Sequence, residues 1–177
     1  MIVYKRYKKI WIILLIDLVS FVYTLPAWSL ALERFKVDPI PIVSSFQLVD
    51  AAGKIYTLEQ FKGKKIILNF WATWCLPCLE EMPSMDLLQS QFADQLTVLP
   101  VSLEINDSKQ VHDFYQQVHI THLPIYFDEQ HISQRLFRLR AFPTSLIINE
   151  QGFIIAKIEG QLDWQSNEVK EFLGLKK

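Results

Sequence analysis

The chain has 177 residues, of which 50% are hydrophobic and 21% are charged, and its formal net charge is −1. This near-neutral balance excludes the excess of basic residues that marks many nucleic-acid-binding proteins, and we expect no nucleic-acid partner. Small proteins outside the cytoplasm often carry several structural disulfides. This chain has only two cysteines, so a functional pair is a better explanation for them than a structural one.

The N-terminal 31 residues have the pattern of a targeting segment. Four basic residues between positions 5 and 9 precede a hydrophobic run from Ile10 to Leu25, and Ser29-Leu30-Ala31 resembles a cleavage site. This order predicts a signal peptide cleaved after Ala31. An uncleaved membrane anchor is the alternative, although Asp17 within the apolar run counts against it. Both interpretations place the remaining domain, residues 32–177, outside the cytoplasm.

The folded part is predicted to contain a β-hairpin, then a β-α-β-α unit, then a β-β-α unit. Residues 33–45 are expected to be an irregular lead-in, because Pro39 and Pro41 disfavour regular structure. The hairpin is expected where two alternating segments flank Ala51-Ala52-Gly53. The later elements, predicted from periodicity and capping residues, are a helical turn at 58–62, a buried strand at 66–71, a helix ending near Phe92, a strand at 96–103, a helix at 109–118, a short extended segment at 124–128, helical spacing at 132–139, strands at 145–149 and 153–158, and a helix at 163–173.

A Cys-x-x-Cys motif lies between a predicted strand and a predicted helix. Cys75 falls at the helix N-terminus, where unpaired N–H groups and the helix dipole favour the thiolate that attacks disulfides. Cys78, three residues later, is placed to resolve a mixed disulfide. A structural zinc site needs four ligands, and this pair supplies two. The motif therefore predicts a dithiol/disulfide redox centre, and we expect no metal and no cofactor.

Two motifs carry a resemblance to a known family. The first is the run from Asn69 to Cys78, Asn-Phe-Trp-Ala-Thr-Trp-Cys-x-x-Cys, with Pro83 after it, and the second is Phe142-Pro143-Thr144-Ser145 before a strand. Over residues 40–173 the sequence resembles the TlpA/ResA-like (CcmG/DsbE-like) extracytoplasmic thioredoxin-family proteins. The resemblance implies an α/β thioredoxin fold with an added N-terminal β-hairpin. It also implies a cis peptide bond before Pro143, which then faces the cysteine pair.

The resemblance also implies a proton acceptor in the helix after the cysteines. Cytosolic thioredoxins carry a buried aspartate where this chain has Asn69, whereas family members often place an acid three residues after the second cysteine, here Glu81. Glu81 is on the helix face of Cys78 and could take its proton if burial raises the glutamate pKa. The alternative is a solvated glutamate near a helix N-terminus, as expected for Glu80.

The remaining site residues are expected to meet the substrate. An exposed Trp74 beside the nucleophile would be a contact surface for partner proteins. Leu76 and Pro77, between the cysteines, would tune the thiol pKa values and the reduction potential. The resemblance implies that Phe142 and Pro143 shape a groove for an extended substrate segment.

The activity implied by the resemblance is thiol–disulfide exchange outside the cytoplasm. The dithiol would reduce disulfides of a client protein, for example an apocytochrome c during cytochrome c maturation. A membrane thiol transporter of the DsbD/CcdA type would then restore the dithiol. Three alternatives stay open: a disulfide oxidase or isomerase, a thiol peroxidase, and a non-catalytic metal-binding module of similar fold. Reduction potential, peroxide consumption and copper binding separate them in turn.

Overall fold

The computed structural model describes residue 32 and residues 35–42, 46–104 and 108–176. The expected targeting segment, residues 1–31, lies outside these ranges. Within them, no helix is both long enough and apolar enough to cross a bilayer. Residues Phe35–Lys177 form one compact unit.

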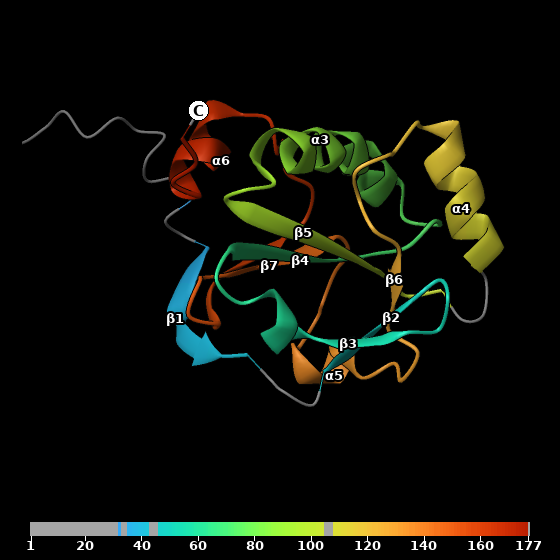
Figure 1. The fold of residues 1–177 in the computed structure, drawn as a ribbon, viewed down its shortest axis with the longest axis horizontal. Helices are drawn as coiled ribbons and strands as arrows, with labels where there is room; N and C mark the ends of the chain where they lie inside the picture. The colour runs from blue at the N-terminus through green and yellow to red at the C-terminus, as the bar shows by residue number, and fades with distance from the viewer. Residues whose placement is uncertain (1–31, 33–34, 43–45, 105–107, 177) are drawn as a thin grey trace, which may run out of the picture. The chain divides into compact units, whose positions relative to one another are not determined.

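This unit is built around a mixed sheet in which the described strands take the order β1-β8-β7-β4-β5-β6-β2-β3 (Figure 1). In chain order the elements are β1 (Lys36–Pro41), β2 (Gln47–Asp50), β3 (Ile55–Thr57), the 3-10 helix η1 (Leu58–Phe61), β4 (Lys65–Trp71), α3 (Leu76–Phe92), β5 (Leu96–Ser102), α4 (Ser108–Gln117), β6 (Tyr126–Phe127), α5 (Ser133–Leu136), β7 (Thr144–Ile148), β8 (Phe153–Glu159) and α6 (Asn167–Phe172). This arrangement is the expected α/β thioredoxin-like fold.

The two faces of the sheet are covered by different elements. In Figure 1, α3 lies on one side of the central strands and α5 on the other. Because side chains alternate along a strand, Leu68 and Phe70 of β4 enter the core cluster that also contains Phe137 from the α5 side. Asn69, between them, points the other way and bonds to a side chain of α3. Burial on both faces explains the nearly continuous apolar sequence of β4.

The pairing of β4 with β7 positions the cysteine motif. These two strands are antiparallel, with Asn69 opposite Ser145 and Phe70 opposite Thr144. The C-terminal end of β4 therefore lies beside the N-terminal end of β7. As a result, the segment that follows Trp71 and the segment that precedes Thr144 meet at the same end of these two central strands.

Most of the predicted elements are confirmed, and some end earlier than expected. β2 and β3 form the expected antiparallel hairpin, which joins the sheet through the pairing of β2 with β6. The helix after the cysteines ends at Phe92 as predicted. α6 is shorter than the predicted 163–173 helix because Ser166 caps it, its side chain accepting the N–H of Val169.

The prediction of an irregular lead-in is wrong for Lys36–Pro41, which form strand β1 at one edge of the sheet. Proline cannot donate to a strand ladder, but an edge strand needs donors on one side only. The pairing of β1 with β8 also shifts register between Lys36 and Ile40, the stretch that contains Pro39. The irregular stretch and the edge position together accommodate the prolines.

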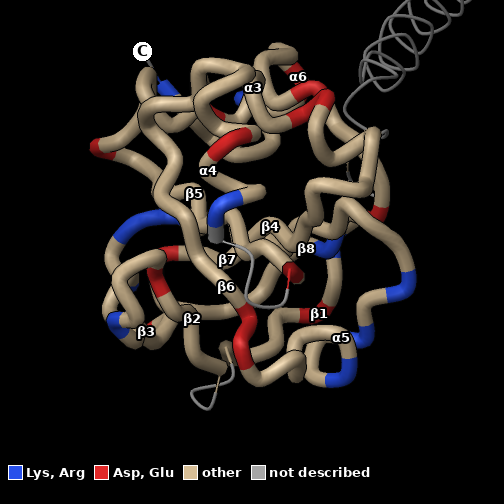
Figure 2. The backbone as a smooth tube through the Cα atoms, turned by 90° about the vertical axis from the view of Figure 1, so that its right-hand side faces the viewer, with Lys and Arg blue, Asp and Glu red and all other residues tan. Residues whose placement is uncertain are grey.

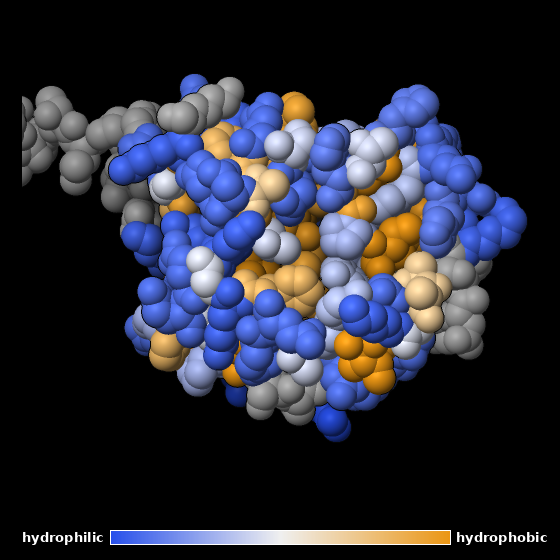
Figure 3. All heavy atoms as spheres, viewed as in Figure 1, coloured by the Kyte–Doolittle hydropathy of each residue, from blue (hydrophilic) through white to orange (hydrophobic). Residues whose placement is uncertain are grey.

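The charged residues are spread around the unit. Figure 2 shows Lys and Arg and also Asp and Glu on many segments of the tube. On the face shown in Figure 3, hydrophobic side chains gather in the middle and hydrophilic ones surround them. The presence of both basic and acidic residues in Figure 2 agrees with the near-neutral net charge of −1.

A buried carboxylate on α3 fastens the segment between α4 and β6. Oδ1 of Asp86 accepts the backbone N–H groups of Thr121, His122 and Leu123 at 3.1, 2.7 and 3.0 Å, and Oδ2 lies 3.0 Å from Nδ1 of His122. Partial burial raises the pKa of Asp86, but the hydrogen bonds from His122 and the backbone outweigh it and hold that pKa below 3.8. The ionised form is thus the one that the fold stabilises.

We expect Asp86→Ala to lower the free energy of unfolding by about 2–4 kcal/mol, because it deprives three N–H groups of their acceptor. Asp86→Asn keeps a carbonyl oxygen as an acceptor and should therefore lower the free energy of unfolding by less than Asp86→Ala does. Because the folded pKa is depressed, the contribution of Asp86 is complete above pH 3.8 and disappears as the pH falls through the folded pKa. Urea unfolding of the three proteins at pH 7 measures the effect, and an alanine variant as stable as the wild type would contradict it.

Candidate active site

The two cysteines are joined by a disulfide at the junction of β4 and α3. Cys75 is the N-cap residue of α3, and its carbonyl accepts the N–H groups of Cys78 and Leu79 at 2.9 and 3.1 Å. Cys75 is 6% exposed and Cys78 is fully buried. Of the two cysteines, Cys75 is therefore the one that reaches the surface, beside the N–H groups of the first helical turn.

The expected substrate-contact residues lie around Cys75. Trp74 and Leu76 are 68% and 65% exposed, which is unusual for large hydrophobic side chains. The ring of Phe142 packs edge-on against that of Trp74 with 6.0 Å between centroids. The peptide bond between Phe142 and Pro143 is cis, as the family resemblance implied. The ring contact brings the residue before Cys75 against the residue before Pro143.

A carboxylate that the sequence analysis missed holds the turn before Cys75. Oε1 of Glu104, which follows β5, accepts both the backbone N–H and the hydroxyl of Thr73, and its Oε2 accepts the hydroxyl of Ser102. Thr73 is thereby tied to the end of the neighbouring strand. This tie fixes the direction in which the chain leaves β4 and presents Trp74.

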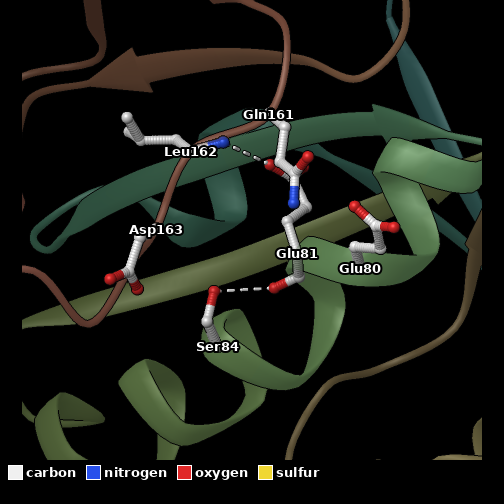
Figure 4. A pocket seen from close by; sticks show the side chains of 6 residues that line it. All are labelled: Glu80, Glu81, Ser84, Gln161, Leu162 and Asp163. Carbon is white, nitrogen blue, oxygen red and sulfur yellow. Dashed lines mark hydrogen bonds between the residues drawn. The ribbon is translucent and has the colours of Figure 1, made fainter.

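Glu81 is buried beneath the surface, one turn along α3 from Cys78. Its side chain is held by groups from three parts of the chain: Oε1 accepts Nδ2 of Asn69 at 2.8 Å, and Oε2 accepts the backbone N–H of Leu162 and the indole N–H of Trp164 at 3.1 and 3.3 Å. The residue is 2% exposed. It nevertheless lines a small pocket with Glu80 and Asp163 (Figure 4).

Burial raises the pKa of Glu81 from 4.5 to about 7, because the loss of hydration outweighs the hydrogen bonds from Leu162, Asn69 and Trp164 that stabilise the carboxylate. A carboxyl group with this pKa is divided between its two protonation states near neutral pH. It can therefore accept or return a proton at little cost, which is what general acid–base chemistry requires. The expected condition for a role of Glu81, a pKa raised by burial, is met.

Asn69 links Glu81 to the sheet. Its Nδ2 donates to Oε1 of Glu81 and lies 2.9 Å from the hydroxyl of Ser145, its partner residue on β7. Its Oδ1 is buried and has no hydrogen-bond partner among the described residues. If the amide turns by 180°, Oδ1 can accept from a protonated Glu81, so Asn69 suits both protonation states of the carboxyl group.

The groups that hold Glu81 were only partly visible in the sequence. Asn69 and Ser145 were each named within a family motif, but nothing in the sequence paired them. Leu162 and Trp164 carried no signal because they come from a distant segment. The strand pairing of β4 with β7 brings in Ser145, and the segment before α6 brings in Leu162 and Trp164. No local pattern in the sequence reports such contacts.

Comparison with known proteins agrees with this geometry. The model of the AhpC/TSA family matches residues 40–157. The chain belongs to this family. Among relatives, it is 40% identical to the thioredoxin-like protein YneN of Bacillus subtilis over 111 residues, which are 62% of this chain and 64% of YneN. It is 31% identical to the thiol-disulfide oxidoreductase ResA of Bacillus thuringiensis subsp. konkukian over 118 residues, 66% of this chain and 67% of ResA.

A solved structure supports the same assignment. The exposed lipoprotein thioredoxin Etrx1 of Streptococcus pneumoniae superimposes with a TM-score of 0.62 and 26% identity, over 72% of this chain and 96% of that one. The expected resemblance to TlpA/ResA-like proteins is thus confirmed for this AhpC/TSA family member. The part matched to YneN is less than two thirds of that relative's length.

The raised pKa of Glu81 predicts a pH dependence of stability. The folded protein keeps the Glu81 proton up to about pH 7, whereas an unfolded glutamate releases it near 4.5. Stability from this group is therefore complete below pH 4.5 and falls by about 3 kcal/mol as the pH rises to 7. Urea unfolding of the oxidised protein across pH 4–8 should show this fall in the wild type and in Glu80→Gln, an exposed matched control, but not in Glu81→Gln. Equal slopes in all three would contradict the account.

Proposed function

We propose that this protein is an extracytoplasmic thiol–disulfide oxidoreductase that reduces disulfides of client proteins through Cys75 and Cys78. The observation that carries the proposal is the placement of the pair at the start of α3, with Cys75 reaching the surface and Cys78 buried behind it. The name of the relative ResA, thiol-disulfide oxidoreductase, supports the same class of reaction.

The reaction starts from the reduced pair. The thiolate of Cys75 attacks one sulfur of a client disulfide, which forms a mixed disulfide and releases the other client sulfur as a thiolate that takes up a proton. The thiol of Cys78 then loses its proton, and its sulfur attacks Cys75. This step releases the second client sulfur and leaves the Cys75–Cys78 disulfide. Two electrons pass from the protein to the client. The two client thiolates take up two protons from solvent, and the protein releases the proton of Cys78 to solvent.

Glu81 is the proposed acceptor for the Cys78 proton. It lies three residues further along α3, on the same helix face, and its pKa of about 7 lets it take a proton at neutral pH. The pocket that it lines with Glu80 and Asp163 would let that proton leave to solvent (Figure 4). The three hydrogen bonds to its oxygens keep the carboxyl group in place while its charge changes.

The client is proposed to dock on the exposed side chains around Cys75. Trp74, Leu76 and Pro77 are exposed, and the contact of Trp74 with Phe142 supports a groove that runs from the cysteine motif to the loop of Pro143. An extended client segment lying in this groove would present its disulfide to Cys75. Apolar contact in such a groove gives affinity without demanding one client sequence.

The compartment and the partners are also part of the proposal. We place the domain, residues 32–177, outside the cytoplasm, with residues 1–31 as a signal peptide or membrane anchor. The description of Etrx1 as an exposed lipoprotein supports an extracytoplasmic site. A membrane thiol transporter of the DsbD/CcdA type would return electrons to the disulfide. A disulfide-containing apocytochrome c is the first client to test.

Trapping variants test the mechanism. Cys78→Ser should accumulate a stable mixed disulfide between Cys75 and a disulfide-bonded peptide, because the resolving thiol is gone. Cys75→Ser should accumulate far less, because its remaining thiol is buried. Mass spectrometry of the non-reduced mixtures measures both.

Two outcomes would contradict the proposal. Equal trapping by the two variants would mean that Cys75 is not the entry nucleophile. Faster oxidation of the wild-type dithiol by hydrogen peroxide than by disulfide peptides would assign the chain to the thiol peroxidase alternative.

A further inference from the structure

A second pocket opens beside the proposed docking surface. Trp74 and Phe142 form part of its wall, and Asp128, His131 and Ser133 line it as well. Trp74 and Phe142 directly precede Cys75 and Pro143. The pocket is thus next to the place where a client disulfide must sit, and it is separate from the one that Glu81 lines.

The polar groups of this pocket are buried and not fully used. Asp128 and Ser133 are only 2% and 1% exposed. The carboxylate of Asp128 accepts the backbone N–H groups of Ile132 and Ser133 at 3.3 and 2.9 Å, one on each oxygen. The hydroxyl oxygen of Ser133 is buried and has no hydrogen-bond partner among the described residues. Such a group is costly and rare, and a partner that arrives from outside would account for it.

We propose that this pocket binds an arginine side chain of the client, located beside the client's reactive cysteine. The inference rests on the proposed function, since it names the kind of client sequence that the oxidoreductase prefers. An extended chain advances about 3.3 Å per residue, so a residue one or two positions from the cysteine can reach a pocket bordered by Trp74.

The chemistry of the pocket selects a guanidinium group. A guanidinium group carries only donors, which suits the Asp128 carboxylate and the Ser133 hydroxyl at the same time. Its flat face stacks on aromatic rings such as those of Trp74 and Phe142. A lysine ammonium is compact and strongly hydrated and cannot stack in this way. An acidic client residue would place its charge near Asp128, which is unfavourable.

The charges around the pocket permit a cation. Among the described residues that line it there is one acid, Asp128, one imidazole, His131, and no lysine or arginine. Arg135 and Arg138 are exposed, on and just after α5, where Figure 2 shows blue segments. These two exposed arginines repel a cation that binds in the pocket. Salt screens this repulsion more strongly than it screens the attraction between the cation and Asp128 inside the pocket.

Synthetic disulfide peptides test the inference. Four peptides would differ only at the residue next to the cysteine, which would be arginine, citrulline, norleucine or glutamate. Citrulline keeps the shape of arginine and removes its charge. Because a neighbouring charge also changes the intrinsic reactivity of the disulfide, each kcat/KM is divided by the rate with dithiothreitol. We expect the arginine peptide to be reduced about tenfold or more faster than the citrulline peptide, the size of a charged hydrogen bond, with glutamate slowest.

Variants locate the preference in the pocket. Asp128→Asn and Ser133→Ala should bring the ratio of arginine to citrulline close to one. Asn keeps an acceptor for α5, and Ser133→Ala removes a hydroxyl without a partner, so both should fold. Glu129→Gln, an exposed neighbour that loses the same charge outside the pocket, should keep the ratio.

Each outcome is decisive for the arginine pocket. Equal reduction of all four peptides, or a preference that survives both pocket variants, would overturn it and leave the oxidoreductase proposal intact. If none of the peptides is reduced, the oxidoreductase proposal fails, and this inference fails with it.

Discussion

The antiparallel pairing of β4 with β7 is the constraint on which the site depends. It places Asn69 opposite Ser145 in the buried layer. It also brings together the C-terminal end of β4, which leads to Trp74, and the N-terminal end of β7, which Phe142 precedes. Neither the cysteine motif nor the cis proline loop would form a groove alone. A slip of one residue in this register would turn Asn69 away from α3 and leave Glu81 without its partner on the sheet.

The same register explains how a carboxyl group is kept inside the molecule. Burying Glu81 raises its pKa to about 7, so the fold holds a group that changes charge near neutral pH. Hydrogen bonds from the sheet and from the segment before α6 fix its position on both sides. This placement destabilises the ionised form of Glu81, but it leaves a proton acceptor in the buried layer one helical turn from Cys78.

The sequence predicts the elements near the cysteines well, because their signals are local. The apolar run of β4, the capping position of Cys75 and the end of α3 at Phe92 all follow from short patterns. The lead-in strand β1 was missed because its prolines are tolerated only at an edge, which the sequence does not reveal. Glu104 and Trp164 were missed because their roles arise from contacts between distant segments.

The reduction potential of the Cys75–Cys78 pair, measured by equilibration with glutathione and dithiothreitol across pH, tests the direction of electron flow. The account predicts a low potential, at or below roughly −220 mV, as expected for a dithiol that donates electrons to client disulfides. A value near roughly −120 mV, typical of a strong oxidant, would contradict it and would mean that the pair donates disulfides to its partners.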